Sequence, residues 1–298
     1  METKKSLLIT AIAVAAFVII ESCSKSSNGY NNTTPPPPAA PTGIAVSTSA
    51  TLGSYLTDNQ NHALYFFAND ANGQDSCTGG CATIWPPFNI AQLTAGNLGA
   101  GLNLSDFGTI TSAEEGKQLT YKGWPLYTYA PASNGVNMPE AAGLTSGDGI
   151  GTVFFVAKPD YTIMLANVQL VGLDGKNYTS TYTEGVGKSS YFTTATGITL
   201  YTFSKDSANH NKFTKSDFSN NTVFPIYDTS SIVVPSTLSK TDFGTIQVFG
   251  QTQLTYKGWP LYNYGQDSTK RGLNKAVSFP VPGNWPVAVQ GVTPAPTP

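Results

Sequence analysis

The sequence predicts an all-β protein made of two tandem domains. Charged residues make up only 11% of the chain and aromatic residues another 11%, while 29 glycines and 20 prolines supply many turns. Aromatic residues favour strands, and Gly and Pro favour turns. No segment after Cys23 has a long helical period, so any helix is expected to be short. We therefore expect small β-sandwich or open-barrel domains.

The first 22 residues have the features of a signal peptide. Two lysines precede an apolar run from residue 7 to residue 20, which is shorter than the roughly 20 residues that span a bilayer. The run ends Ile20-Glu21-Ser22-Cys23, which resembles the bacterial lipobox, where a small residue precedes a Cys that is lipidated. Glu21 departs from that pattern, so ordinary cleavage that leaves Cys23 as a free thiol is the alternative. We expect lipidation.

Residues 23–43 are expected to form a tether that holds the domains away from a membrane. The segment 24–41 reads SKSSNGYNNTTPPPPAAP, and its four consecutive prolines favour an extended polyproline helix. Domain 1 is expected at 44–168, domain 2 at 169–292 and a tail at 293–298. Ser24 after the lipid site resembles outer-membrane sorting in Gram-negative bacteria. The expected location is the cell envelope, anchored by the N-terminal lipid.

Internal repeats support the two-domain division. QLTYKGWPLYTY at 118–129 and QLTYKGWPLYNY at 253–264 agree at eleven of twelve positions. SDFGTI at 105–110 and TDFGTI at 241–246 repeat at an offset of 136, close to the offset of 135 between the longer strings. A nearly constant offset over separate blocks indicates a tandem duplication. Each copy also holds two weaker half-repeats, and the alternative to two domains is a four-bladed propeller that uses all four units in one ring.

Each half-repeat is expected to contain a hairpin. Lys122-Gly123 reads as a two-residue turn, since Gly readily adopts the positive φ that such turns require. Pro125 follows in the outgoing strand, and because it has no N–H it belongs on an edge strand or at a bulge. The companion hairpin turns at residues 59–61, and its counterpart in the second copy has Gly197 in the turn.

The half-repeats share the pattern Tyr-x-aromatic-x-x-Asp, although Ala132 replaces the Asp in one of them. The favoured interpretation is structural: the rings fill a core and each Asp closes the following turn. The alternative is an aromatic shelf that binds a sugar or a flat cofactor, with Trp124 and Trp259 expected to be exposed. The candidate binding residues are Tyr65, Phe67, Asp70, Trp85, Trp124, Tyr127, Tyr129, Tyr201, Phe203, Asp206, Trp259, Tyr262, Tyr264 and Asp267.

Cys77 and Cys81 are expected to form a disulfide, because they lie four residues apart around Gly-Gly in an exported protein. The second copy has Phe213 and Asp217 at these positions, so the fold does not require the bond. A zinc site lacks further ligands, since the chain has only two histidines. A covalent haem needs Cys-x-x-Cys-His, and a redox dithiol usually has Cys-x-x-Cys on a thioredoxin-like fold.

The sequence contains few residues or motifs that are typical of catalysis. It contains no nucleophile elbow, phosphate loop, dinucleotide fingerprint or His-Glu-x-x-His. The loop 70–75 is rich in oxygen ligands but lacks EF-hand spacing, so a polar turn is preferred over a calcium site. Glu114-Glu115 reads as a solvated turn. A net charge of −2 and the lack of a basic stripe argue against nucleic acid. We expect no enzyme activity, catalytic residues, metal or cofactor.

The ordered motifs Tyr-x-aromatic-x-x-Asp, Cys-x-x-x-Cys-Ala-x-x-Trp-Pro-Pro at 77–87 and Gln-x-x-Tyr-x-Gly-x-Pro-Leu-Tyr at 118–127 resemble an exported repeat lipoprotein family, a secreted repeat of unknown function. The second copy lacks the cysteines and has Phe224-Pro225 in place of Trp85-Pro86, so it is expected to be degenerate. The resemblance implies export and fold more than activity.

The expected function is that of a membrane-anchored, non-catalytic binding or structural module, whose partner is an unknown glycan, small molecule or envelope protein. The alternatives are a redox accessory or electron-transfer partner that uses Cys77 and Cys81, and a glycan-active surface protein.

Overall fold

The computed structural model describes residues 39–112, 114, 116–133 and 135–298. Residues 40–298 form one compact unit. The predicted signal peptide, Cys23 and most of the predicted tether lie outside the described residues, as does Glu115. Across the described part of the chain, no helix is both long and apolar enough to cross a membrane.

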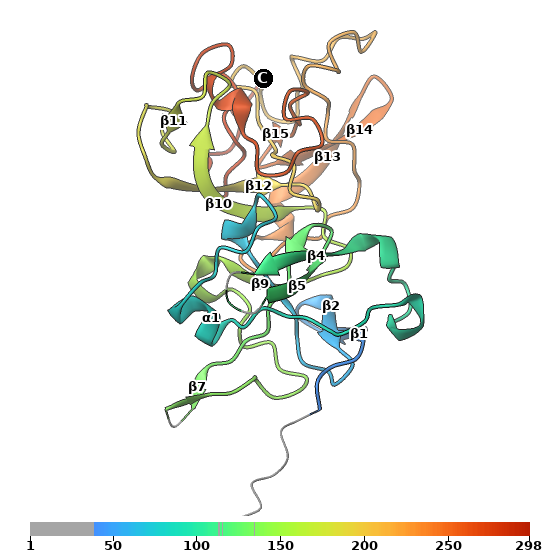
Figure 1. Ribbon diagram of the computed structural model, residues 1–298. Coiled ribbons are helices and arrows are strands. Elements are labelled where there is room, and N and C mark those ends of the chain that lie inside the picture. Colours follow the sequence, from blue (N-terminus) through green and yellow to red (C-terminus); the bar gives the residue numbers. More distant parts are fainter. Residues whose placement is uncertain (1–38, 113, 115, 134) are drawn as a thin grey trace, which may run out of the picture. The chain divides into compact units, whose positions relative to one another are not determined.

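The all-β class is confirmed. The strands form antiparallel sheets of two or three strands each, and within the described residues none of these sheets closes into a barrel. Figure 1 shows the strands of the first copy from blue to green and those of the second from yellow-green to red.

The strands of the first copy pair as β1-β2, β3-β9, β4-β5-β6 and β7-β8. Their bounds are β1 (Ile44–Ser49), β2 (Gly53–Asp58), β3 (Tyr65–Phe67), β4 (Phe107–Ser112), β5 (Gly116–Tyr121), β6 (Trp124–Pro125), β7 (Ala132–Ser133), β8 (Val136–Asn137) and β9 (Phe154–Val156).

The second copy pairs its strands as β11-β10-β12 and β13-β14-β15. The bounds are β10 (Met164–Val171), β11 (Asn177–Tyr178), β12 (Lys188–Thr193), β13 (Phe243–Val248), β14 (Gln251–Tyr256) and β15 (Trp259–Pro260). The helices are short, as expected. They are α1 (Gly80–Ile84) and the 3-10 turns η1 (Ala68–Asp70), η2 (Ala95–Asn97), η3 (Leu104–Asp106), η4 (Ile150–Thr152), η5 (Lys240–Asp242) and η6 (Lys275–Ser278).

The predicted Lys-Gly hairpins are confirmed in both copies. Tyr121 pairs with Trp124 across Lys122-Gly123, whose φ angles are 48° and 78°. Two consecutive positive φ angles define the primed turn that matches the twist of the flanking strands. Pro125 lies on β6, which is an edge strand, so its missing N–H breaks no ladder.

The companion turns also match between the copies. In the first copy Thr57 bridges to Ala63, and Asn61 has a φ of 69°. In the second copy Thr193 bridges to Thr199, and Gly197 has a φ of 85°. Asn tolerates this left-handed conformation and Gly adopts it freely, which explains the exchange of one for the other.

The predicted boundary between residues 168 and 169 falls within β10. Residues 164–169 of this strand pair with β12, so β10 belongs to the second copy from its first residue. One core cluster contains buried side chains from both predicted domains, among them Phe66, Trp124 and Tyr201. The division into two domains stays a prediction.

Candidate functional site

The four motif tyrosines meet in pairs inside the protein. Tyr65 and Tyr127 exchange backbone hydrogen bonds of 2.9 and 3.0 Å, and Tyr201 and Tyr262 exchange bonds of 2.8 and 2.9 Å. All four side chains are fully buried, with 0% exposure. Each bridge joins the two half-repeats of one copy, so the motif lies where the halves meet.

In the second copy the two half-repeats exchange hydrogen bonds between side chains. The Tyr262 hydroxyl donates to Asp206 Oδ2 at 2.8 Å, and the Tyr201 hydroxyl donates to Asp267 Oδ2 at 2.5 Å. Each Tyr therefore binds the Asp of the other half-repeat and not its own. This reciprocity explains why Tyr and Asp recur together: each half needs the other's carboxylate to satisfy its buried hydroxyl.

The first copy forms the same two tyrosine–carboxylate hydrogen bonds, but a Glu takes the place of one Asp. The Tyr127 hydroxyl donates to Asp70 Oδ2 at 2.5 Å and to Asp75 Oδ1 at 2.9 Å. The Tyr65 hydroxyl donates to Glu140 Oε1, which takes the place of the Asp that Ala132 replaces. Glu140 is buried and also accepts from the Ser146 backbone at 2.9 Å. Sequence reasoning missed Glu140, because the pattern gave no reason to look eight residues beyond Ala132.

The other oxygen of each motif Asp closes the following turn, as expected. Asp70 Oδ1 accepts from the Ser76 backbone at 2.9 Å and from its hydroxyl at 2.6 Å. Asp206 Oδ1 accepts from the backbone of Lys212 at 2.7 Å, and Asp267 Oδ1 accepts from that of Lys275 at 3.0 Å. Both oxygens of each carboxylate therefore have protein donors.

Burial controls the protonation of these pairs. Desolvation raises the pKa of Asp70 to about 7 and that of Asp206 to about 6, although the tyrosine hydrogen bonds work in the opposite direction. It also raises the pKa of Asp267. Desolvation and the neighbouring carboxylates raise the pKa of the Tyr127 and Tyr262 hydroxyls far above the ordinary value. The tyrosines therefore keep their protons and act as donors.

An aromatic stack lies beside each tyrosine pair. Trp85 stacks on Phe154 with a centroid separation of 3.8 Å, and in the second copy Phe224 stacks on Trp285 at 3.4 Å. Phe224 stands where the first copy has Trp85, so the members of the Trp–Phe pair are exchanged. The loss of Trp at that position, which suggested degeneracy, is compensated by Trp285 from a distant segment.

Most of the other candidate aromatic rings pack against the same two stacks. Phe67 stacks on Phe154 at 4.2 Å, and Phe203 stacks on Trp285 at 4.4 Å. Tyr129 packs on Trp85 at 4.5 Å, and Tyr264 has only 1% exposure. Most of the candidate binding residues therefore contact one another and not solvent. That some of them also bind a ligand stays a prediction.

The expected exposure of Trp124 is wrong. Its side chain has 0% exposure, and its Nε1 donates to the Ala195 carbonyl of the second copy at 3.0 Å. The Arg271 guanidinium lies over its ring at 4.4 Å. The reason is packing between the copies, which no local pattern reveals. Trp259 is partly exposed, and its Nε1 donates to the Thr293 carbonyl at 2.9 Å.

The predicted disulfide is confirmed. Cys77 and Cys81 are bonded, with their Cα atoms 5.2 Å apart. Cys77 is fully buried, and the Trp85 N–H donates to the Cys81 carbonyl at 2.8 Å, so the disulfide lies next to the stack of Trp85 and Phe154. In the second copy Phe213 replaces Cys77 and packs edge-on against Trp285 at 4.8 Å. An aromatic contact thus replaces the covalent one.

The loop that resembled a calcium site uses its carboxylates internally. Asp75 Oδ1 accepts from the Cys77 backbone at 2.9 Å, and its Oδ2 accepts from the Ser112 hydroxyl at 2.5 Å. Within the residues that the structure describes, no group of three or more His, Cys, Asp or Glu side chains is arranged to hold a metal.

Comparison with known proteins identifies one family. The family described as a secreted repeat of unknown function matches residues 46–89. This segment contains β2, β3, Asp70, the disulfide and Trp85, and the match confirms the resemblance drawn from the motifs. No curated protein and no solved structure matches the chain.

Proposed function

We propose that this protein is a membrane-anchored, exported module without catalytic activity, and the match of residues 46–89 to a secreted repeat family supports its export. In this proposal the Tyr-x-aromatic-x-x-Asp motifs hold the half-repeats together and keep the module rigid. The observation that carries the proposal is the exchange of buried hydroxyl–carboxylate hydrogen bonds between half-repeats, such as Tyr262 to Asp206 and Tyr201 to Asp267.

This exchange leaves the motif little capacity for a ligand. The hydroxyl of Tyr201 and both oxygens of Asp267 already have partners, and both side chains are fully buried. A binding shelf needs open aromatic faces, whereas the faces of Trp85 and Phe154 cover one another. The motif therefore supports a structural role more strongly than a shelf.

Anchorage rests on Cys23 and is tested by fractionation. We expect the wild type in the membrane fraction and the Cys23→Ala variant in the soluble fraction, because the lipid on Cys23 is the membrane attachment in this proposal. The matched control is the double variant Cys77→Ala and Cys81→Ala, which removes the other two cysteines and should stay in the membrane. Membrane retention of Cys23→Ala would refute the lipid anchor.

A redox role is the second candidate, favoured by the partial exposure of Cys81 in a formed disulfide. Reduction potentials separate the two roles. A structural disulfide in an exported protein is expected to have a reduction potential below about −300 mV, whereas oxidoreductases lie between about −270 and −120 mV. A potential in the oxidoreductase range would favour electron transfer and oppose a structural disulfide.

A further inference from the structure

The Lys-Gly-Trp turn of the first copy is a docking surface for the second copy. Two polar atoms of the turn have hydrogen-bond partners in the second copy: Trp124 Nε1 donates to the Ala195 carbonyl at 3.0 Å, and the Lys122 carbonyl accepts from Arg271 Nη1 at 3.2 Å. A Cβ on Gly123 would lie 2.2 Å from that Nη1, so the glycine permits the close approach of the guanidinium. This turn and the residues that cover it form one of the contacts between the copies, beside others such as the hydrogen bond from Arg271 Nε to the Ala71 carbonyl at 2.9 Å.

The second copy presents the same turn, and a different segment satisfies the same two atoms. Trp259 Nε1 donates to the Thr293 carbonyl at 2.9 Å, and the Lys257 carbonyl accepts from the Ala295 backbone N–H at 2.9 Å. Ala295 is buried, and a Cβ on Gly258 would lie 3.4 Å from its Cβ. Residues 292–296 therefore take the place at Trp259 that Ala195 and Arg271 take at Trp124.

The residues of the second copy that contact the Trp124 turn also have equivalents in the first copy. In the second copy these residues are the turn 194–198 and the adjoining residues 271–273, joined by a hydrogen bond from the Gly272 N–H to the Gly197 carbonyl at 3.0 Å. In the first copy the Gly143 N–H donates to the Asn61 carbonyl at 2.7 Å. The turn 58–62 and residues 142–144 are thus the equivalent face.

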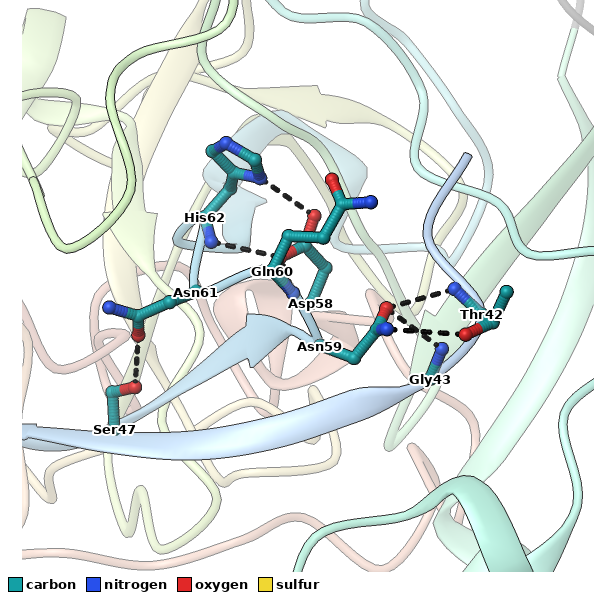
Figure 2. A network of polar contacts seen from close by, with 8 residues as sticks. All are labelled: Thr42, Gly43, Ser47, Asp58, Asn59, Gln60, Asn61 and His62. Carbon is teal, nitrogen blue, oxygen red and sulfur yellow. Dashed lines mark hydrogen bonds and ion pairs between the residues drawn. The ribbon is translucent and has the colours of Figure 1, made fainter. Parts of the chain in front are cut away.

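Among the residues that the structure describes, this face is held by hydrogen bonds and is largely exposed. Figure 2 shows the hydrogen bonds that hold the turn: Asp58 accepts from the His62 backbone and contacts its imidazole, each at 2.9 Å, and Asn61 Oδ1 accepts from Ser47 at 2.6 Å. Asn59 Oδ1 accepts from the backbone N–H groups of Thr42 at 2.9 Å and Gly43 at 3.2 Å. Asn59 and Asn61 are exposed, and Leu144 is 51% exposed. Its equivalent in the second copy, Leu273, is only partly exposed. A preorganised face binds with less loss of conformational entropy.

We propose that residues 292–296 cap an interaction surface around Trp259, and that the uncapped surface binds the face formed by residues 58–62 and 142–144 of a second copy of this chain. The contact repeats the internal one: Trp259 Nε1 donates to the Asn59 carbonyl, as Trp124 Nε1 does to that of Ala195. Ala142 stands where the second copy has Arg271, so the contact lacks the guanidinium stack and is weaker than the internal contact. Such a head-to-tail contact forms open chains or rings.

The test compares the full-length protein with a variant that lacks residues 292–298, both purified in the same non-ionic detergent. Sedimentation velocity over a hundredfold range of concentration is the readout. We expect the wild type to keep one sedimentation coefficient and the truncated variant to sediment faster as its concentration rises. The full-length variant Ala295→Trp, whose indole cannot fit against Gly258, should displace the cap and associate in the same way.

A substitution on the opposite face identifies the surface that the uncapped Trp259 binds. Leu144→Asp in the truncated protein should abolish association, whereas Val186→Asp, at a residue with 85% exposure outside both faces, should leave it unchanged. Thermal unfolding checks that each variant is folded. Folded truncated and Ala295→Trp variants that both stay monomeric would overturn the proposal, as would association that survives Leu144→Asp, because another surface would then be responsible.

Discussion

Removing a single hydroxyl tests whether the tyrosine–carboxylate exchange stabilises the fold. In Tyr262→Phe the ring and its packing remain, but Asp206 Oδ2 loses the donor that lies 2.8 Å away. A hydrogen bond to a charged group contributes about 1.5–3 kcal/mol, and a buried acceptor left without a partner costs a similar amount. We expect Tyr262→Phe to lower the free energy of unfolding by about 2 kcal/mol at pH 8.

The cost should depend on pH in a defined direction. The pKa of Asp206 is about 6, and the Tyr262 hydrogen bond is one of the interactions that lower it, so removing the hydroxyl raises it further. At pH 5 the carboxyl is protonated with or without the hydroxyl, and the lost bond is one between neutral groups. We therefore expect a cost of about 1 kcal/mol at pH 5, measured by urea unfolding of both proteins at each pH.

Tyr264 supplies the matched control. Its ring is equally buried, but its hydroxyl has no hydrogen-bond partner among the described residues. Tyr264→Phe should therefore leave stability unchanged or raise it by up to about 1 kcal/mol, since it removes an unsatisfied buried group. Equal losses in Tyr262→Phe and Tyr264→Phe would refute the reasoning, because the effect would then come from the loss of any hydroxyl and not from the exchange with Asp206.

Two further predictions follow from the buried carboxylates and the hairpin turns. The folded pKa values of Asp70 and Asp206 lie above the ordinary 3.8, so the stability that these groups contribute is complete below about pH 4 and is lost as the pH rises through 6 to 7. The free energy of unfolding of the wild type, measured in urea, should therefore fall by at least about 2 kcal/mol between pH 4 and pH 7. A rise over this pH range would contradict the raised pKa values. Gly123→Ala should destabilise the protein by at least about 1 kcal/mol more than Gly116→Ala, because both glycines have positive φ but only at Gly123 would a Cβ meet the Arg271 guanidinium; equal losses of thermal stability would show that this close approach does not matter.

The features that the sequence determined depend on contacts between near neighbours. The Lys122-Gly123 turn follows from the residues that tolerate positive φ, and the edge position of Pro125 follows from its missing N–H. The Cys77–Cys81 disulfide spans four residues, so few alternative partners compete. Period and composition likewise sufficed for the all-β class, because short strands and frequent turns are local properties.

Tertiary structure alone decided which distant groups meet. Glu140 accepts from Tyr65 across 75 positions in the sequence, and this partner lies outside the repeat pattern. Trp285 compensates for the missing Trp at Phe224 from 61 residues away, because only the packed core brings the two rings together. Trp124 is buried by the second copy and not by its own hairpin, so its exposure depended on packing that no local spacing encodes.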